Sequence, residues 1–243
     1  MNANEKVCII IPAYNEGTVI GSVLDALPRS VKIGKQVLPI TTIVVNDGSA
    51  DNTSTEVTKR PWAVLIDHIM NSGAGAATRT GLSYARQHGF TAAITMDADG
   101  QHHPDDAAKL INEILKSEAD LIIGTRFKDT SGMPARRIIG TRGLNLITFF
   151  LFGVWVSDVQ SGMKAFSRRA IEAIHIRSNN FAFCSEIIWM AHVQKLRISE
   201  VPIKVIYTTY SLSKGQLGQT DIVAGMRFLR QLLKQRFMRS ING

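Results

Sequence analysis

The feature that most constrains the fold is a repeated order of segments in the first 125 residues. A short, almost uninterrupted apolar run is followed each time by a polar cluster and, in most cases, by a stretch with helical spacing. The five runs read KVCIIIPAY, TTIVVNDGS, AVLIDHI, TAAITMDADG and ADLIIGTRF. Strands that are buried on both faces have this continuous apolar character, and β-α-β order makes them parallel. The sequence therefore predicts an α/β fold with a mostly parallel sheet flanked by helices.

Three of the intervening stretches predict helices. NEGTVIGSVLDALP places its apolar residues on one helix face, and AATRTGLSYARQHG reads as a helix that ends near Gly89. PDDAAKLINEILKS starts with a proline and two acidic residues, which is typical of a helix N-terminus. Beyond about residue 130 the rhythm breaks, although ISEVPIKVIY still predicts a strand. We therefore expect one α/β domain over residues 1–220.

The longest apolar run extends from Leu144 to Val156 and contains Asn145 and Thr148. A helix that crosses a bilayer needs about 20 residues, so this run predicts a buried or interfacial helix. The start of the chain does not resemble a signal peptide, and two isolated cysteines form neither a disulfide framework nor a zinc motif. A cytoplasmic location is the simplest expectation.

The last segment, residues 221–243, predicts a basic amphipathic helix. Its apolar stripe consists of Ile222, Met226, Leu229, Leu233 and Phe237. Arg227, Arg230 and Lys234 flank that stripe. One interpretation is a helix that packs on its own domain or on a second copy of the chain. The other is an interfacial helix on an anionic membrane surface, which agrees with the net charge of +8.

The polar clusters follow the strands at the edge where α/β sheets bind ligands. They read PAYNE, NDGS, NSGAG, DADGQ and GTRF. In the fourth cluster, Asp97, Asp99 and the amide oxygen of Gln101 form a set of hard oxygen donors that suits Mg²⁺ or Mn²⁺ together with phosphate oxygens. The alternative is a turn at Asp99 with Asp97 capping the next helix. His102 and His103 are expected to be surface residues at that helix start.

The NSGAG cluster has two interpretations. It resembles a dinucleotide-binding fingerprint, with Asp97 about 20 residues further on. However, Thr78 replaces the third small residue and the loop follows the third strand, not the first. We expect instead that the small residues around Gly75 allow the backbone to approach a phosphate-bearing donor.

Taken together, the motifs resemble a known family. IIIPAYNE, VVNDGSADNT, NSGAGAATRTG, MDADGQHHPDD, IIGTRF and VSDVQSGMKAFSRR occur in the order and spacing of family 2 glycosyltransferases of the GT-A fold. The resemblance covers roughly residues 6–210 and is greatest to the polyprenyl-phosphate branch, which includes dolichyl-phosphate mannose synthase. It implies an inverting enzyme, dependent on Mg²⁺ or Mn²⁺, that moves sugar from a GDP- or UDP-sugar to a polyprenyl phosphate. It also implies peripheral attachment to the cytosolic membrane face and no nucleic acid partner.

The resemblance also implies roles for individual residues. The donor-binding residues would be Pro12, Ala13, Tyr14, Glu16, Asp47, Gly75, Asp97, Ser213 and Lys214. The metal ligands would be Asp97, Asp99 and Gln101. The acceptor phosphate would face Arg126 together with Arg137 or Arg142. The catalytic residues would be Asp99, Arg126 and Glu186.

Two alternatives remain for the function. The acceptor could be a hydroxyl of a soluble glycan or protein, in which case Glu186 would be indispensable as a base. The chain could also be a non-catalytic protein that binds the donor or acts as a membrane scaffold. The three arginines could lie on solvated surfaces, and Glu186 could instead be the partner of an arginine.

Overall fold

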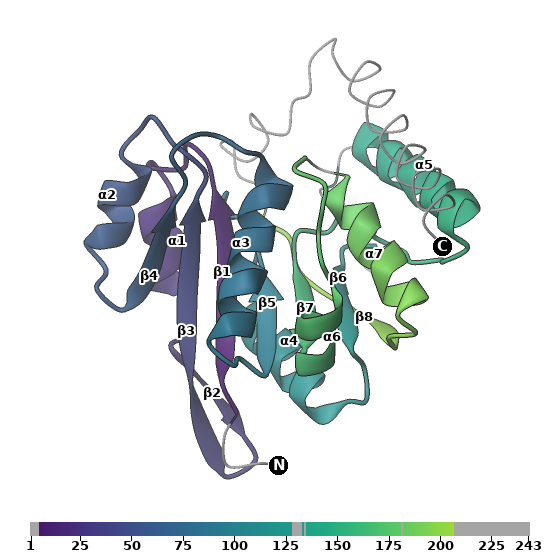
Figure 1. Cartoon of the computed structure of the whole chain (residues 1–243), viewed down its shortest axis with the longest axis horizontal. Coiled ribbons are helices and arrows are strands. Elements are labelled where there is room, and N and C mark those ends of the chain that lie inside the picture. Colours follow the sequence, from purple (N-terminus) through teal and green to yellow (C-terminus); the bar gives the residue numbers. More distant parts are fainter. Residues whose placement is uncertain (1–4, 128–132, 134, 181, 207–243) are drawn as a thin grey trace.

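The computed structural model describes residues 5–127, 133, 135–180 and 182–206, in which one sheet is covered by helices on both faces (Figure 1). The strands are β1 (Val7–Ala13), β2 (Ser30–Ile33), β3 (Gln36–Asn46), β4 (Ala63–Asp67), β5 (Ala92–Thr95), β6 (Leu121–Thr125), β7 (Lys164–Ser167) and β8 (Ile198–Pro202). The helices are α1 (Ile20–Ala26), α2 (Thr53–Thr58), α3 (Ala74–Gln87), α4 (Pro104–Lys116), α5 (Ala135–Phe152), α6 (Arg168–Ala173) and α7 (Phe183–Val193).

The sheet has eight strands in the order β2-β3-β1-β5-β7-β6-β8, with β4 paired to β3. Six strands run in one direction, and only β2 and β7 are antiparallel to their neighbours. The prediction of a mostly parallel α/β sheet is therefore confirmed. The two antiparallel strands were not predicted, because each has only four residues and β7 contains a lysine among its inward-facing residues.

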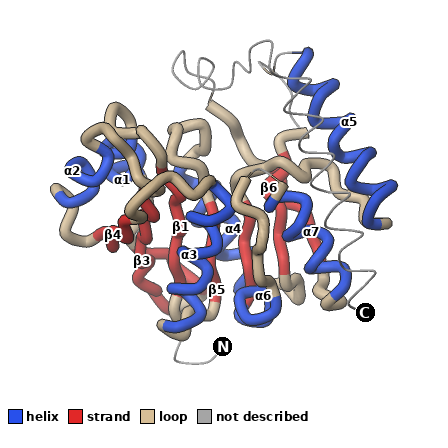
Figure 2. The backbone as a smooth tube through the Cα atoms, turned by 45° about the horizontal axis from the view of Figure 1, so that its top comes forward, coloured by secondary structure: helices blue, strands red, loops and turns tan. Residues whose placement is uncertain are grey.

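The core lies on both faces of the sheet, as the continuous apolar strands predicted. On β1, Ile9 and Ile11 contact one apolar cluster with α1 and α4, whereas Cys8 and Ile10 contact another with α3, α6 and α7. Figure 2 shows these helices on both sides of the strands. Both faces of the sheet bury apolar surface, which stabilises the central strands. The loops at the ends of these strands therefore start from a rigid base.

The three predicted helices are confirmed as α1, α3 and α4. Helix α4 begins at Pro104, and the side chain of His103 accepts a hydrogen bond from the Asp105 backbone N–H. The apolar run from Leu144 forms the second half of α5, which lies beside α7 at one end of the molecule (Figure 1). Within the described residues, no helix has the length and apolar character needed to span a membrane.

Some predicted residues cannot be placed. Ser213, Lys214 and the expected helix over residues 221–243 lie outside the described residues. Arg137 belongs to the first turn of α5, but its side chain also lies outside what is described.

Candidate active site

The structure brings the predicted polar clusters to one edge of the sheet. The ends of β1, β3 and β4 are in register, with Ala13 opposite Asn46 and Asn46 opposite Asp67. Strand β5 pairs with β1 in parallel and ends just before Asp97. The clusters that follow these strands therefore meet at their carboxyl ends, as expected for a parallel sheet.

The PAYNE segment is joined to the loop that follows β3. The backbone N–H of Asn15 donates to the Ser49 hydroxyl at 2.9 Å, and the Asn15 side chain accepts from the Ala50 N–H at 2.9 Å. The Glu16 N–H donates to the Thr53 hydroxyl at 2.9 Å. Among the predicted donor residues, Pro12 is half-buried and Ala13 buried at the strand end, Tyr14 is 45% exposed, and the Glu16 side chain is buried.

Asp47 is buried and uses both carboxylate oxygens within the chain. It accepts hydrogen bonds from the backbone N–H groups of Ser72 (3.0 Å) and Gly73 (2.7 Å), and it pairs with His68 Nδ1 at 2.7 Å. The residue thus holds the NSGAG loop against the end of β3. Sequence reasoning did not identify His68 as a site residue, although it lies near the end of the predicted strand AVLIDHI.

Gly75 makes its close approach to the chain itself. A Cβ atom at Gly75 would lie 2.1 Å from the Ser178 carbonyl oxygen, and one at Gly73 would lie 2.2 Å from that of Asn179. The start of α3 is therefore packed against the 178–179 backbone. The small residues serve this internal contact, and an approach of Gly75 to a donor stays a prediction.

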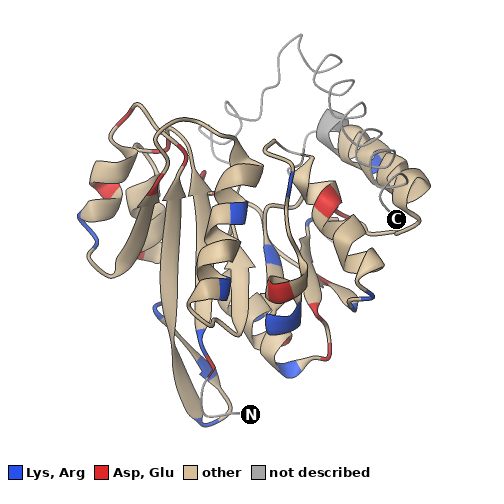
Figure 3. Ribbon diagram, in the orientation of Figure 1, with Lys and Arg blue, Asp and Glu red and all other residues tan. Residues whose placement is uncertain are grey.

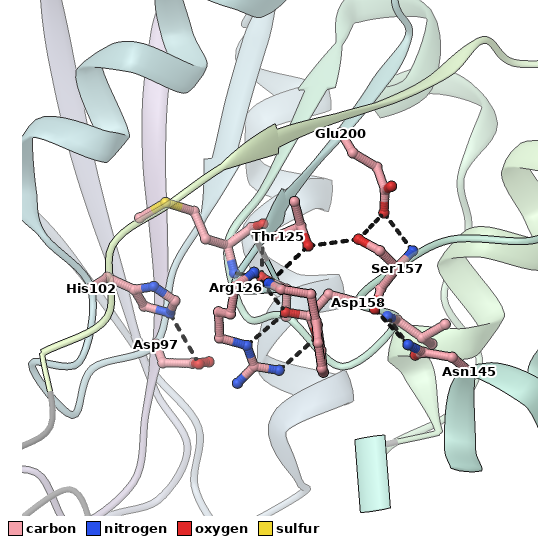
Figure 4. Close-up of polar contacts among 12 residues, drawn as sticks. Asp97, His102, Thr125, Arg126, Asn145, Ser157, Asp158 and Glu200 are labelled. Atoms are coloured by element: carbon pink, nitrogen blue, oxygen red, sulfur yellow. Dashed lines mark hydrogen bonds and ion pairs between the residues drawn. The ribbon is translucent and has the colours of Figure 1, made fainter. Parts of the chain in front are cut away.

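The D-x-D cluster forms a turn after β5. Asp99 Oδ1 accepts a hydrogen bond from the Gln101 N–H at 3.0 Å, and Asp97 Oδ2 lies 3.2 Å from His102 Nε2 (Figure 4). His102 is only 5% exposed, and its Nδ1 has no hydrogen-bond partner among the described residues. The expectation that His102 is a surface residue is wrong, because the turn directs its ring back toward Asp97. His103, in contrast, lies at the surface at the start of α4.

A second contact confines the Asp97 carboxylate. A Cβ atom at Gly162 would lie 2.0 Å from Asp97 Oδ2, so only a glycine leaves room for the carboxylate in this position. Asp97 is therefore held between the His102 ring and the Gly162 backbone. Gly162 belongs to the quoted VSDVQSGMKAF motif, but its spacing gave no sign of a contact with the D-x-D.

The two aspartates respond differently to their surroundings. Desolvation works to raise the pKa of Asp97, but the hydrogen bond with His102 and the positive charges of His102, Arg126 and Lys164 outweigh it and lower the pKa. Desolvation and the negative charge of Asp97 raise the pKa of Asp99. A cation between the carboxylates would offset the repulsion between Asp97 and Asp99.

The donor set fits a hard divalent cation. Asp97, Asp99 and Gln101 offer oxygen ligands on one turn, which suits Mg²⁺ or Mn²⁺. The described residues contain no cluster of three or more His, Cys, Asp or Glu side chains arranged around one metal position. The protein would therefore supply only part of the coordination shell, and phosphate oxygens of a donor would complete it.

Arg126 follows β6 and is fixed by an aspartate that sequence reasoning missed. Its Nε and Nη2 donate to the two carboxylate oxygens of Asp158, each at 2.6 Å, and its backbone N–H donates to Asp158 Oδ2 at 3.2 Å (Figure 4). Asp158 is fully buried and the Arg126 side chain is 12% exposed. Lys164 is also buried, and its Nζ donates to the Ser161 carbonyl oxygen. Arg142, in contrast, is exposed on α5.

Glu186 is buried at the start of α7. Its carboxylate accepts hydrogen bonds from the backbone N–H groups of Arg177 (3.1 Å) and Ser178 (2.8 Å). It thereby holds the same 177–179 segment that contacts Gly73 and Gly75. A catalytic role for Glu186 stays a prediction, and the observed contacts give it a role in positioning this segment.

Comparisons with known proteins point in one direction. The family model for glycosyl transferase family 2 matches residues 8–174. The chain is 36% identical to a UDP-N-acetylglucosamine–dolichyl-phosphate N-acetylglucosaminyltransferase of Methanococcus voltae, over 95% of this chain and 96% of that protein. It is 28% identical to a polyprenol monophosphomannose synthase of Mycolicibacterium smegmatis, over 91% of this chain and 84% of that protein.

A solved structure has a similar fold. Glucosyl-3-phosphoglycerate synthase from Mycobacterium tuberculosis, in complex with Mn²⁺, UDP-glucose and phosphoglyceric acid, aligns with a TM-score of 0.70 and 17% identity. The alignment covers 98% of this chain and 80% of that one. It agrees with the GT-A type of α/β sheet expected from the sequence.

Proposed function

Because the chain belongs to glycosyl transferase family 2, we propose that it transfers a sugar from a nucleotide-diphosphate sugar to a polyprenyl phosphate at a membrane surface. The names of the two relatives support this acceptor class, since one contains dolichyl phosphate and the other polyprenol monophosphomannose. In this proposal the donor binds along the loops that follow β1, β3 and β5. The acceptor phosphate lies toward Arg126, after β6.

The observation that carries the proposal is the exposed apolar surface of α5. Its buried residues include Thr141, Asn145 and Thr148. The exposed apolar side chains on this helix and just after it are Ile139, Leu146, Phe149, Phe150 and Trp155. Apart from Arg142, the part of α5 whose side chains are described carries no charge (Figure 3).

An exposed apolar surface of this kind is unfavourable in water and favourable against lipid. Phe150 is 72% exposed and Trp155 is 61% exposed. The helix is also joined to the loop that holds the Arg126 partner, through Asn145. A membrane on this face would bring a lipid phosphate toward Arg126. The apolar stripe and basic residues of the 221–243 segment predict a second contact with the same surface.

The chemistry fits a phosphate nucleophile. The second pKa of a phosphate monoester is about 6, so near pH 7 the acceptor is largely dianionic and needs no strong base. The residues then have to position the two substrates, with Arg126 near the acceptor phosphate and Asp97 held by His102 and Gly162 near the donor diphosphate. The divalent cation, when bound, supplies Lewis-acid stabilisation to the leaving nucleoside diphosphate. Inversion follows from attack on the sugar face opposite that leaving group.

The test is a panel of UDP- and GDP-sugars with one polyprenyl phosphate, in Mn²⁺, in Mg²⁺ and in excess EDTA. We expect transfer from one donor, loss of transfer in EDTA, and loss in Asp99→Asn. Asp105→Asn is a matched control, since Asp105 lies in the first turn of α4 and its side chain is 91% exposed. Full activity in EDTA would overturn the metal role, and transfer to a soluble hydroxyl acceptor alone would overturn the lipid acceptor.

The membrane contact is tested separately by co-sedimentation with anionic vesicles. Phe150→Ser should reduce vesicle binding, whereas Val37→Ser should not, because Val37 is similarly exposed (65%) but lies on the β2–β3 hairpin away from α5. Removal of residues 221–243 should reduce binding further and make the remainder less sensitive to salt, since basic residues near an anionic surface contribute about 1 kcal/mol each. Equal binding by all variants would exclude both contacts.

A further inference from the structure

The segment from Ser157 to Val159 lies between α5 and the end of β6 and is held from both sides. On one side is Asn145 of α5, which is 3% exposed. Its Nδ2 donates to the Ser157 carbonyl oxygen at 2.5 Å, and its Oδ1 accepts from the Val159 N–H at 3.1 Å. One amide side chain therefore forms hydrogen bonds with the residues before and after Asp158 (Figure 4).

The other side of the segment is attached to the sheet. The Ser157 N–H and hydroxyl both contact Glu200 Oε1 of β8, at 2.6 and 2.8 Å. The same hydroxyl shares a hydrogen bond of 2.6 Å with Thr125 Oγ1 at the end of β6. Ser157 is thus fixed relative to the two strands that flank Arg126, and the remaining connection runs to α5.

Asp158, between the two residues that Asn145 holds, sets the orientation of Arg126. The Asp158 carboxylate has no exposed surface and accepts hydrogen bonds from both Nε and Nη2 of the guanidinium. A two-point pair of this kind fixes the plane of the guanidinium as well as its position. A shift of the Asp158 backbone would therefore move or rotate Arg126, because the buried pair cannot be exchanged for water without a large penalty.

We infer that Asn145 is a positioning residue for Arg126 and couples the seating of α5 on an apolar surface to the geometry of the acceptor site. The inference rests on the proposed function only for the identity of the acceptor. The chain of contacts runs from the exposed face of α5 through Asn145 to Ser157 and Val159, then to Asp158 and Arg126. The cost of burying this amide is offset because its Nδ2 and its Oδ1 each make a hydrogen bond.

The variants are chosen to separate positioning from general stability. Asn145→Leu has nearly the same shape and removes both hydrogen bonds, whereas Asn145→Asp keeps the acceptor for Val159 and loses the donor to Ser157. Thr148→Val is the matched control. Thr148 is a buried polar residue on the same helix, but its hydroxyl bonds Ser185 of α7 at 3.2 Å and makes no described hydrogen bond with residues 157–159.

The first readout is kinetic. Asn145→Leu should raise the KM for polyprenyl phosphate about tenfold or more, and leave the affinity for donor nucleotide and for vesicles unchanged, because only the acceptor side loses its fixed geometry. Thr148→Val should leave that KM unchanged even if it lowers the unfolding temperature equally. An equal KM change in both variants, or an equal loss of donor affinity in Asn145→Leu, would overturn the inference.

The second readout does not require transfer activity. The Nε–Hε NMR signal of Arg126, assigned by its absence in Arg126→Lys, reports the pair with Asp158. It should shift or broaden in Asn145→Leu and Asn145→Asp, stay in place in Thr148→Val, and change its chemical shift when the wild-type chain binds lipid nanodiscs. An unchanged signal in both Asn145 variants would overturn the inference even where transfer to polyprenyl phosphate is observed. If no polyprenyl phosphate is an acceptor, the proposed function fails, and this signal still decides the role of Asn145.

Discussion

The loops that follow β1, β3 and β4 lie on the same sheet edge as the surroundings of Arg126, but the two regions are held by different interactions. In the first region, neutral side chains such as Asn15 and Ser49 accept hydrogen bonds from backbone N–H groups of neighbouring loops, and the buried Asp47 carboxylate does the same. In the second region, buried charged groups dominate, with Asp158 paired to Arg126 and Lys164 enclosed nearby. The first region is a set of joined loops, and the second is a charged centre inside the protein.

The difference has an energetic consequence. A neutral hydrogen bond in a loop contributes about 0.5–1.5 kcal/mol to stability, so the loss of one such bond has a small effect on folding. Removal of one partner from a buried ion pair leaves an unpaired charge in the interior and costs about 3–5 kcal/mol. We therefore expect single substitutions around Arg126 to affect folding and activity together, whereas single substitutions of neutral side chains in the donor-side loops should act mostly on nucleotide binding.

The largest expected effect is that of Asp158→Asn. It leaves the Arg126 guanidinium buried beside a neutral amide, and we expect the free energy of unfolding to fall by about 3–5 kcal/mol. Urea unfolding followed by circular dichroism measures this change. Transfer to the acceptor should be lost even at temperatures where the variant is folded.

The matched control for this substitution is Asp25→Asn. Asp25 makes the same two-point contact with Arg60, at 2.8 and 2.5 Å, but its side chain is 57% exposed. Water replaces the lost partner there, so little change in stability is expected. Equal losses in the two variants would contradict the proposed contrast between a buried charged centre and a solvated surface pair.

The next effect concerns the junction of the two regions, where Gly162 meets Asp97. Gly162→Ala would place a methyl group within 2.0 Å of Asp97 Oδ2, so the carboxylate has to move. We expect the affinity for Mn²⁺ with UDP or GDP to fall about tenfold or more, because a misplaced ligand loses its bond to the cation. Calorimetry measures this affinity directly. Gly140→Ala, with nothing within 4 Å of its added Cβ, should leave the affinity unchanged.

The sequence was sufficient to predict the first region. Its strands are continuous apolar runs, and each loop follows its own strand, so the parallel order alone places Pro12, Asp47 and Asp97 on one edge. The same rules predicted α1, α3 and α4 from apolar spacing and the proline at the start of α4. Local patterns were enough to place these loops, but they did not reveal the contact of His68 with Asp47 or that of Gly75 with Ser178.

The second region could not be predicted in this way. Asp158, Gly162 and Lys164 meet Arg126 and Asp97 only because β7 runs antiparallel between β5 and β6, and a four-residue strand with a buried lysine gives no strand pattern. His102 was expected at the surface, because a histidine beside a helix start usually is. Its burial depends on the Asp97 carboxylate and on a bridge to Val205, over 100 residues away.

A smaller effect is expected for Glu186, which in the contacts described bonds only to the backbone of Arg177 and Ser178. Glu186→Gln keeps an oxygen acceptor for Ser178, so transfer to polyprenyl phosphate should fall by less than about tenfold, with no change in the pH profile. A dianionic phosphate needs no base. If the acceptor is instead a sugar or protein hydroxyl, Glu186→Gln should abolish transfer and remove the acidic limb of the pH profile. The pH dependence of kcat/KM for the wild-type chain and for Glu186→Gln decides between these acceptors.

The smallest expected effect is the reactivity of the two cysteines, which are both buried. Cys8 is in the central strand β1, and Cys184 is in α7 beside the charged centre. Burial raises the pKa of both thiols above the ordinary value of 9.0. In the folded chain both thiols therefore stay protonated, while in the unfolded chain they ionise as pH rises through that value, so stability is lost above it and unaffected below it. At pH 8 a thiol reagent should label neither cysteine in the native protein and both in denaturant. Faster labelling of Cys184 than of Cys8 under native conditions would show that α7 opens locally, which a rigid charged centre does not allow.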